Sequence, residues 1–387
     1  MYRIGKEEID AVARVIESKA LFKTMGKETE SFEKEMRELL NVKHAVSMTS
    51  GMAGLTSALI GMGIGPGDEV IVPAYTYVAT AFAVLSVGAI PVVAEIDESL
   101  MLDADDVEKK ITPRTKVIIP VHMKGYPVNM DKIMVVAKKH NLLVLEDACQ
   151  AVGGSYKGKR LGTIGNAGAL SFNQFKNISA GEGGALLTND KGIFEKALIY
   201  HDSCAIAYFG NQMQDFSTEV FCGTEYRTNE ITSAIMRVQL TRLDGILADL
   251  RKNKKLLINA LSNYYNFVPS NDPDGECSCA ITFKFDTKEE AIAIRDKIGE
   301  KLLSIPAYLG KHVYYYWDVL FSKKGAAHPL MNPFNMEANK NAPNYTKDMC
   351  KKSVNILSCC AHFEINPDWT EKDIEEIAKK FIDARKQ

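Results

Sequence analysis

Hydrophobic positions in the first half of the chain alternate between short continuous runs and segments where they recur every three or four residues. The continuous runs predict buried strands, and the spaced ones predict amphipathic helices. The expected strands are 44–49, 70–75, 90–96, 116–123 and 142–148, and the expected helices are 5–20, 29–40, 53–62, 76–89, 104–111 and 130–140. Strands that alternate with helices predict an α/β fold with a mostly parallel, doubly wound sheet.

Shorter elements follow in the second half. We expect strands at 169–175 and 184–189, a hairpin at 155–162, and helices at 191–200, 228–255 and 371–385. The long charged helix is a bridge to a second domain, which mixes helices with short strands. We therefore predict a large α/β domain over residues 1–245 and a smaller α+β domain over 246–387. In helix 5–20 the expected core face carries Ile9, Val12, Val15 and Ile16.

Residues 70–94 carry no charged side chain and are long enough to span a bilayer. Pro73 and Pro91 divide the run into strand, helix and strand, which is typical of a β-α-β unit buried on both faces. The N-terminus has charges where a signal peptide has its apolar region. We expect no membrane segment and a cytoplasmic protein.

Composition excludes several classes. The 387 residues are 46% hydrophobic and 25% charged with a net charge of -2, so the chain is globular and has no nucleic-acid footprint. The eight cysteines are scattered, as reduced thiols in a cytosol are. The C-x-C at Cys277 and the C-C-x-H at Cys359 lack zinc-site spacing, so we expect no metal.

Three features carry candidate chemistry. Asp147 stands at the carboxyl end of a predicted buried strand, where open α/β sheets bind ligands. Lys176 follows a strand and precedes a glycine-rich stretch, and a helix opens after Ser50 and Gly51. Each has an ordinary explanation by itself: a helix-capping Asp, a surface Lys, a common β-α connection.

Together the three features match what pyridoxal 5′-phosphate (PLP) needs. The Lys176 amine would form a Schiff base, and the Asp147 carboxylate would keep the pyridine nitrogen protonated. The helix N-terminus at Gly51 would hold the phosphate through backbone N–H groups. Tyr77 offers an aromatic ring to stack on the pyridine.

The segments SGMAGL, GDEVIVPAYTYVAT, LEDACQAVGGSYKGKRLGTIG, LSFNQFKNISAGEGGALLTND and EYRTNEITSAI resemble the fold type I, PLP-dependent sugar aminotransferases. The resemblance covers about residues 1–255. Through EDACQAVGGSYKG the chain is also similar to the transaminase that makes 8-amino-octulosonate. Residues 300–350 differ from that enzyme, so its substrate is not carried over.

The resemblance implies roles for individual residues. Lys176 binds the cofactor and moves protons, Asp147 pairs with the pyridinium, Gln150 lies near the ring hydroxyl and Tyr77 stacks on the ring. Asn229 would reach the phosphate in a partner subunit, which implies a homodimer with shared active sites. The implied phosphate-binding residues are Gly51, Met52, Ala53 and Ser171.

Two departures affect this interpretation. Met52 stands where the family usually has Thr, so one hydroxyl hydrogen bond to phosphate is lost unless Thr49 or Ser50 replaces it. Residues 312–345 are rich in aromatic residues, Pro and Asn. We predict that this segment lines a sugar-binding cleft, in which His328 and Asn332 hydrogen-bond to the hydroxyls of the sugar. The alternative is that Tyr314–Trp317 form a strand of the small domain and the rest of the segment is a surface loop.

The predicted reaction is a ping-pong transamination. Glutamate or glutamine would give its amino group to PLP, and the resulting pyridoxamine phosphate (PMP) would aminate a keto-sugar or keto-cyclitol. One alternative is a PLP-dependent sugar dehydratase, which the intact Lys176 disfavours because such family members carry His there. Another is a non-catalytic ligand-sensing homologue, which the joint presence of Lys176, Asp147 and Gln150 disfavours.

Overall fold

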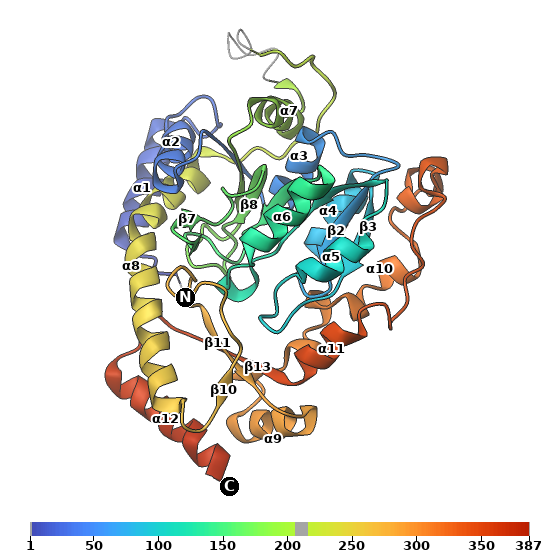
Figure 1. Cartoon of the computed structure of the whole chain (residues 1–387). Coiled ribbons are helices and arrows are strands. Elements are labelled where there is room, and N and C mark those ends of the chain that lie inside the picture. Colours follow the sequence, from blue (N-terminus) through green and yellow to red (C-terminus); the bar gives the residue numbers. More distant parts are fainter. Residues whose placement is uncertain (1, 206–215, 387) are drawn as a thin grey trace.

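The computed structural model describes residues 2–205 and 216–386 and centres on a seven-stranded sheet (Figure 1). Its strands are β1 (His44–Met48), β2 (Glu69–Pro73), β3 (Ile90–Ala94), β4 (Thr115–Ile118), β5 (Leu143–Asp147), β8 (Ala167–Ser171) and β9 (Gly184–Thr188). Their order in the sheet is β1-β9-β8-β5-β4-β2-β3. Only β9 among these strands runs antiparallel to its neighbours, so the predicted mostly parallel sheet is confirmed.

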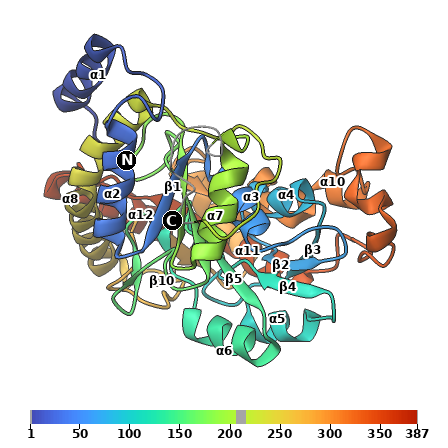
Figure 2. The same ribbon diagram turned by 90° about the horizontal axis from the view of Figure 1, so that it is seen from above.

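Helices cover both faces of this sheet, as Figure 2 shows with α5 (Ala104–Lys110) and α6 (Met130–His140) on one face and α3 (Gly51–Gly61) and α4 (Ala79–Ser86) on the other. Helix α7 (Lys191–His201) packs on α3. Because both faces are covered, the strands are buried almost throughout, which explains the uncharged run from β2 through α4 to β3. None of the helices within the described residues is long and apolar enough to cross a membrane.

A second, antiparallel sheet is built from the C-terminal part of the chain, in the order β10-β11-β13-β12. Its strands are β10 (Asn266–Phe267), β11 (Ala280–Lys284), β12 (Leu303–Ser304) and β13 (Cys360–Glu364). Helices α9 (Lys288–Ile298) and α12 (Glu371–Lys386) accompany this sheet, and α10 (Asp318–Phe321) and α11 (Lys351–Ser358) lie between β12 and β13 in sequence. Short 3-10 turns connect β12 to α11.

Helix α8 (Glu230–Leu261) runs past both parts of the molecule (Figure 1). Helices α1 (Lys6–Ser18) and α2 (Glu28–Leu40) pack on its first half, and α12 contacts it as well. The proposed domain boundary between residues 245 and 246 falls inside this helix. No break in α8 marks it, so the division of the chain stays a prediction.

Helix α1 confirms the expected element but not its expected core face. Ala11 and Val15 are buried against α8, whereas Ile9 is 66% exposed and Ile16 is 57% exposed. Figure 2 shows α1 at the periphery of the molecule, where only one narrow face has a neighbour. The apolar residues on the rest of α1 therefore remain open in a single chain.

Two loop predictions had different outcomes. The hairpin forms from β6 (Ser155–Tyr156) and β7 (Lys159–Arg160), with Lys157 and Gly158 both at positive φ as its two-residue turn requires. The alternative of a strand at Tyr314–Trp317 is wrong. Tyr314–Tyr316 form a 3-10 turn, since Val313 pairs with Tyr75 and the chain turns back immediately afterwards.

Candidate active site

Asp147 ends β5 at the carboxyl edge of the large sheet and is only 5% exposed. The Thr80 hydroxyl donates to its Oδ2 at 2.7 Å, and the Cys149 N–H donates to its Oδ1 at 3.1 Å. Both oxygens thus have a fixed donor. These two donors fix the direction in which the remaining lone pairs of the carboxylate point.

Thr80 belongs to a short relay at the start of α4. Thr76 Oγ1 lies 2.7 Å from Thr80 Oγ1, and both side chains are fully buried. Because Thr80 gives its proton to Asp147, Thr76 must donate to Thr80. Tyr77 lies within the same segment and is 41% exposed, so the candidate stacking ring and the candidate carboxylate are held by one turn of chain.

The N-terminus of α3 meets the ends of β5 and β8. Ser50 caps the helix by accepting from the Ala53 N–H at 3.1 Å. A Cβ added to Gly51 would lie 2.6 Å from Cys149 Sγ and 3.0 Å from Ser171 Cβ, so only glycine fits. The first N–H groups of a helix have no partner within the helix. Ser50 Oγ already accepts the Ala53 N–H, so the cradle can present to an anion only those N–H groups of the first turn that have no partner.

Lys176 lies in the loop between β8 and β9 and is half-buried. Burial raises the pKa of the Cys149 thiol well above its usual value, and the Asp147 carboxylate raises it further while the Lys176 amine lowers it. Cys149 itself is partly buried. It touches the Gly51 cradle and donates its backbone N–H to Asp147, so it joins Asp147 to the α3 N-terminus.

The Lys176 loop is anchored by its neighbour Asn177, which is buried. Its Nδ2 donates to the Val152 carbonyl at 3.1 Å, and its Oδ1 accepts from Cys279 Sγ at 3.0 Å. The loop carrying Lys176 is thereby tied both to the chain after β5 and to the start of β11. No cluster of potential metal ligands occurs in the described part of the chain, around these cysteines or elsewhere.

Gln150 follows on the same connection as Asp147. Its Oε1 accepts from the Lys124 N–H at 3.2 Å. Lys124 adopts a left-handed backbone with φ of 54°, a conformation that is costly for a residue with a side chain. Its Nζ pairs with Glu364 Oε1 at 2.9 Å, which links this point to β13.

Glu146 and Asp147 have separate tasks although they are adjacent. Glu146 is fully buried and accepts from the backbone N–H groups of Gly162, Ile164 and Gly165. It also lies 3.1 Å from His122 Nε2, whose other ring nitrogen accepts from the Val128 N–H. Glu146 therefore fixes the turn before β8, and only Asp147 points toward the site.

The structure brings residues to the site that the sequence pattern did not single out. Thr80 stands one helical turn after Thr76 in TYVAT, a spacing that could have revealed the relay. Lys311 and His312 could not be found that way, because a distant loop delivers them. The Thr76 N–H donates to the His312 carbonyl, and the His312 ring lies 5.4 Å from the Tyr77 ring between centroids.

Three predicted residues lie elsewhere or have other partners. Asn229 is exposed and caps α8, with its Oδ1 accepting from the Thr232 N–H at 3.0 Å. His328 is exposed and caps a 3-10 turn. Asn332 is buried, and its amide bonds to Lys323, Gly325 and Phe334 within its own loop.

The loop that carries Asn332 packs on the amino ends of β2 and β3 through Asn339, whose Oδ1 accepts from the Gly67 N–H and whose Nδ2 donates to the Gly88 carbonyl. That edge is opposite to the one where Asp147 lies. Within one chain, His328 and Asn332 are therefore not brought to Lys176, and their proposed hydroxyl-reading role stays a prediction without support from their contacts. Only the first residues of 312–345 reach the site.

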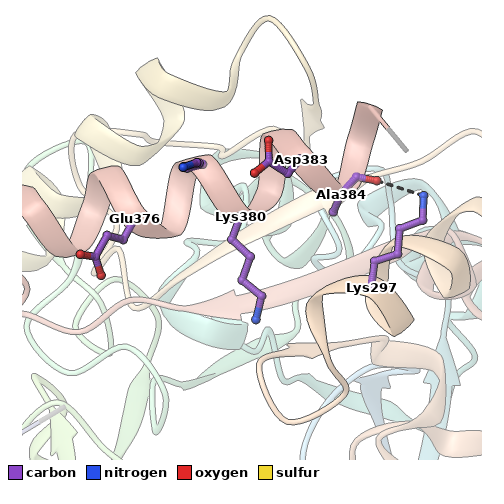
Figure 3. A pocket seen from close by; sticks show the side chains of 6 residues that line it. Lys297, Glu376, Lys380, Asp383 and Ala384 are labelled. Carbon is purple, nitrogen blue, oxygen red and sulfur yellow. Dashed lines mark hydrogen bonds between the residues drawn. The ribbon is translucent and has the colours of Figure 1, made fainter.

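A separate cavity of about 400 Å³ lies between α9 and α12 (Figure 3). Its lining includes Lys297, Glu376, Lys380 and Asp383, with Lys297 Nζ donating to the Ala384 carbonyl at 3.1 Å. It contains none of the predicted site residues. The candidate chemistry is thus at the sheet edge and not in this cavity.

Comparison with known proteins agrees with this geometry. A Bacillus subtilis protein, spore coat polysaccharide biosynthesis protein SpsC, is 35% identical over 84% of this chain and 86% of its own length. The dTDP-3-amino-3,4,6-trideoxy-alpha-D-glucose transaminase of Streptomyces venezuelae is 41% identical over 63% of this chain and 62% of its own length. The crystal structure of S. venezuelae DesV in complex with a ketimine intermediate superposes with a TM-score of 0.79, at 27% identity, covering 98% of this chain and 95% of DesV.

The family model for DegT/DnrJ/EryC1/StrS aminotransferases matches residues 2–382, nearly the whole chain. Enzymes of this family depend on PLP, and the predicted fold type I architecture and aminotransferase class are both confirmed. The chain belongs to the DegT/DnrJ/EryC1/StrS aminotransferase family, to which sugar transaminases belong.

Proposed function

We propose that this enzyme transfers an amino group from glutamate or glutamine to a keto-sugar or keto-cyclitol by a ping-pong mechanism with PLP. The observation that carries the proposal is that Cys149 joins Asp147 to the Gly51 cradle, while Asn177 ties the Lys176 loop to the same connection after β5. When bound, PLP would accept the electrons released as a proton leaves the donor carbon and would carry the amino group between substrates.

The chain's own residues divide the work. Lys176 would bind the cofactor through its amine and then move the proton to and from the donor carbon. Asp147, with both oxygens already oriented, would pair with the ring nitrogen. Tyr77 would cover one face of the ring and Gln150 would lie near its hydroxyl. Backbone N–H groups of Gly51, Met52 and Ala53, with Ser171, would hold the phosphate.

The acting unit in this proposal is a homodimer in which Asn229 reaches the partner's cofactor phosphate. Its support is a set of apolar side chains left open in one chain. Met25 and Phe175 are each 72% exposed, Ile9 is 66% exposed, and Phe175 is next to Lys176 in sequence. Packing against a second copy of the chain would bury such side chains. The Asn229 Oδ1 caps α8, and its amide N–H₂ has no hydrogen-bond partner among the residues that the structure describes.

We also place the enzyme in the cytoplasm. All eight cysteines are free thiols in the structure, and five of them are buried or at the candidate site. Proteins of oxidising compartments usually use that many cysteines for disulfides.

A spectroscopic experiment tests the function. Purified protein reconstituted with PLP should show the cofactor's visible absorption, and glutamate or glutamine should abolish it. The PMP-loaded enzyme should then regain the band with one member of a keto-sugar and keto-cyclitol panel. Lys176→Ala should retain at most noncovalent cofactor and have no turnover.

The same experiment separates the alternatives. A protein that never binds PLP would overturn the proposal and favour a ligand-sensing role. A PLP-loaded protein that ignores every amino donor but dehydrates a keto-sugar would favour the dehydratase.

A further inference from the structure

Lys311 is held beside the candidate stacking residue Tyr77 by its backbone. Its carbonyl accepts from the Val78 N–H at 2.9 Å and from Trp317 Nε1 at 3.3 Å. This pairing attaches the 310–313 turn to the segment that carries Tyr77. Lys311 Nζ lies 5.4 Å from the centre of the Tyr77 ring, so its ammonium is at the open side of the site.

Positive charge is concentrated here. Burial lowers the pKa of His312 to about 4, and the ammonium groups of Lys124, Lys311 and Lys176 add to that effect. His312 is therefore neutral at physiological pH. The three lysines come from separate parts of the chain: Lys124 follows β4, Lys176 follows β8, and Lys311 lies in the 310–313 turn.

The three ammonium groups differ in what neutralises them. Lys124 pairs with Glu364. Lys176 is assigned to the cofactor by the proposed function. Lys311 has no carboxylate within ion-pair distance in the part of the chain that the structure describes. An ammonium left uncompensated at the mouth of a site is suited to bind an anion on the substrate.

We propose that Lys311 binds a carboxylate of the amino donor and so aligns the donor carbon with Lys176. The inference rests on the proposed function, in which glutamate or glutamine reacts first. An amino acid carries a carboxylate next to the carbon that loses its proton, so an ammonium that binds this carboxylate also fixes the position of that carbon. The cofactor phosphate has its own cradle at the α3 N-terminus.

The donor half-reaction tests this role directly. PLP-loaded wild type, Lys311→Met and Lys311→Arg are mixed with glutamate, and the loss of cofactor absorption is followed in single turnovers. We expect Lys311→Met to lower the apparent second-order rate at least about tenfold, chiefly through weaker glutamate binding, and Lys311→Arg to restore most of it. Lys380→Met, in the remote cavity of Figure 3, is the matched control and should behave as wild type.

A donor without a carboxylate gives the decisive contrast. With 1-phenylethylamine, Lys311→Met should react as fast as wild type. An unchanged rate of Lys311→Met with glutamate would overturn the inference, and so would an equal loss with both donors. The effect would then belong to the pocket as a whole and not to a carboxylate contact.

Binding without transfer separates this inference from the proposed function. α-Methylglutamate lacks the proton that must be removed, and its binding can be read from the cofactor spectrum. If wild type transfers no amino group but binds α-methylglutamate at least about tenfold more tightly than Lys311→Met, the carboxylate site stands and the transamination proposal fails. Equal binding by both proteins would refute the carboxylate site.

Discussion

Thr80 donates a hydrogen bond to Asp147 across 67 positions of sequence, with 2.7 Å between Thr80 Oγ1 and Asp147 Oδ2. The bond joins the segment of the candidate stacking residue Tyr77 to the carboxylate proposed to hold the pyridine nitrogen. It makes Thr80 a positioning residue, since it acts on the cofactor site only through Asp147.

Replacing Thr80 by Val should weaken PLP binding to the apoprotein about tenfold. The change keeps the shape but leaves one buried carboxylate oxygen without its donor, and a hydrogen bond to a charged group contributes about 1.5–3 kcal/mol. Thr80→Ser keeps the hydroxyl and should bind PLP almost as wild type does. Titration of apoprotein with PLP, read by absorption, measures both; equal affinities for Val and Ser would contradict the role.

Gly51→Ala should abolish cofactor uptake and lower the free energy of unfolding by about 1–3 kcal/mol, since overpacking a tight site costs that much. The added methyl would lie 2.6 Å from Cys149 Sγ. The second substitution Cys149→Ala removes that sulfur and should recover part of the lost free energy of unfolding. Urea unfolding of the single and double variants measures this recovery. Gly245→Ala on α8, where no atom lies within 4 Å of the new Cβ, is the control and should not destabilise. If the changes in the free energy of unfolding of Gly51→Ala and Cys149→Ala simply add in the double variant, the two side chains do not clash.

Met52→Thr should tighten PLP binding several-fold. Met52 is 37% exposed in the first turn of α3, where the family usually has a hydroxyl. A restored hydroxyl would add one donor to the phosphate. Met52→Val, which has the same branched shape without the hydroxyl, is the matched comparison. If Met52→Thr binds PLP no more tightly than Met52→Val, then Ser50 or another group already supplies this hydrogen bond.

Acid should destabilise the fold before ordinary carboxylates titrate. Burial lowers the pKa of His201 and His362 well below the usual value of 6.5 and that of His312 to about 4. Between pH 6.5 and about 4.5 the unfolded chain therefore binds more protons than the native one. Stability should be full above pH 6.5 and fall below it, by up to about 1.4 kcal/mol per pH unit for each histidine. Urea unfolding across this window measures the slope.

His362→Gln should reduce that slope, because the amide can still bond to Tyr75 and Thr282 but takes up no proton. His44→Gln is a less suitable comparison, since His44 is only partly buried. A slope that does not respond to His362→Gln would mean that other groups account for the acid sensitivity.

The sequence alone determined the order of elements, the sheet class and the main candidate groups. These depend on local patterns: buried runs for β2, β3 and β5, glycine and proline at chain turns, and Asp147 at a strand end. A strand end in a parallel sheet is a ligand site by topology. Asp147, Lys176 and Gly51 could therefore be chosen from the sequence by the chemistry their joint presence permits, and their roles stay proposals.

Only the tertiary structure decided which side chains meet. The Thr80–Asp147 bond, the Cys149 contact with Gly51 and the arrival of Lys311 and His312 beside Tyr77 depend on segments far apart in sequence. It also moved Asn332 to the opposite edge of the sheet and left Ile9 exposed. Periodicity tells which face of an element is apolar, but which neighbour covers that face depends on long-range packing that no local pattern encodes.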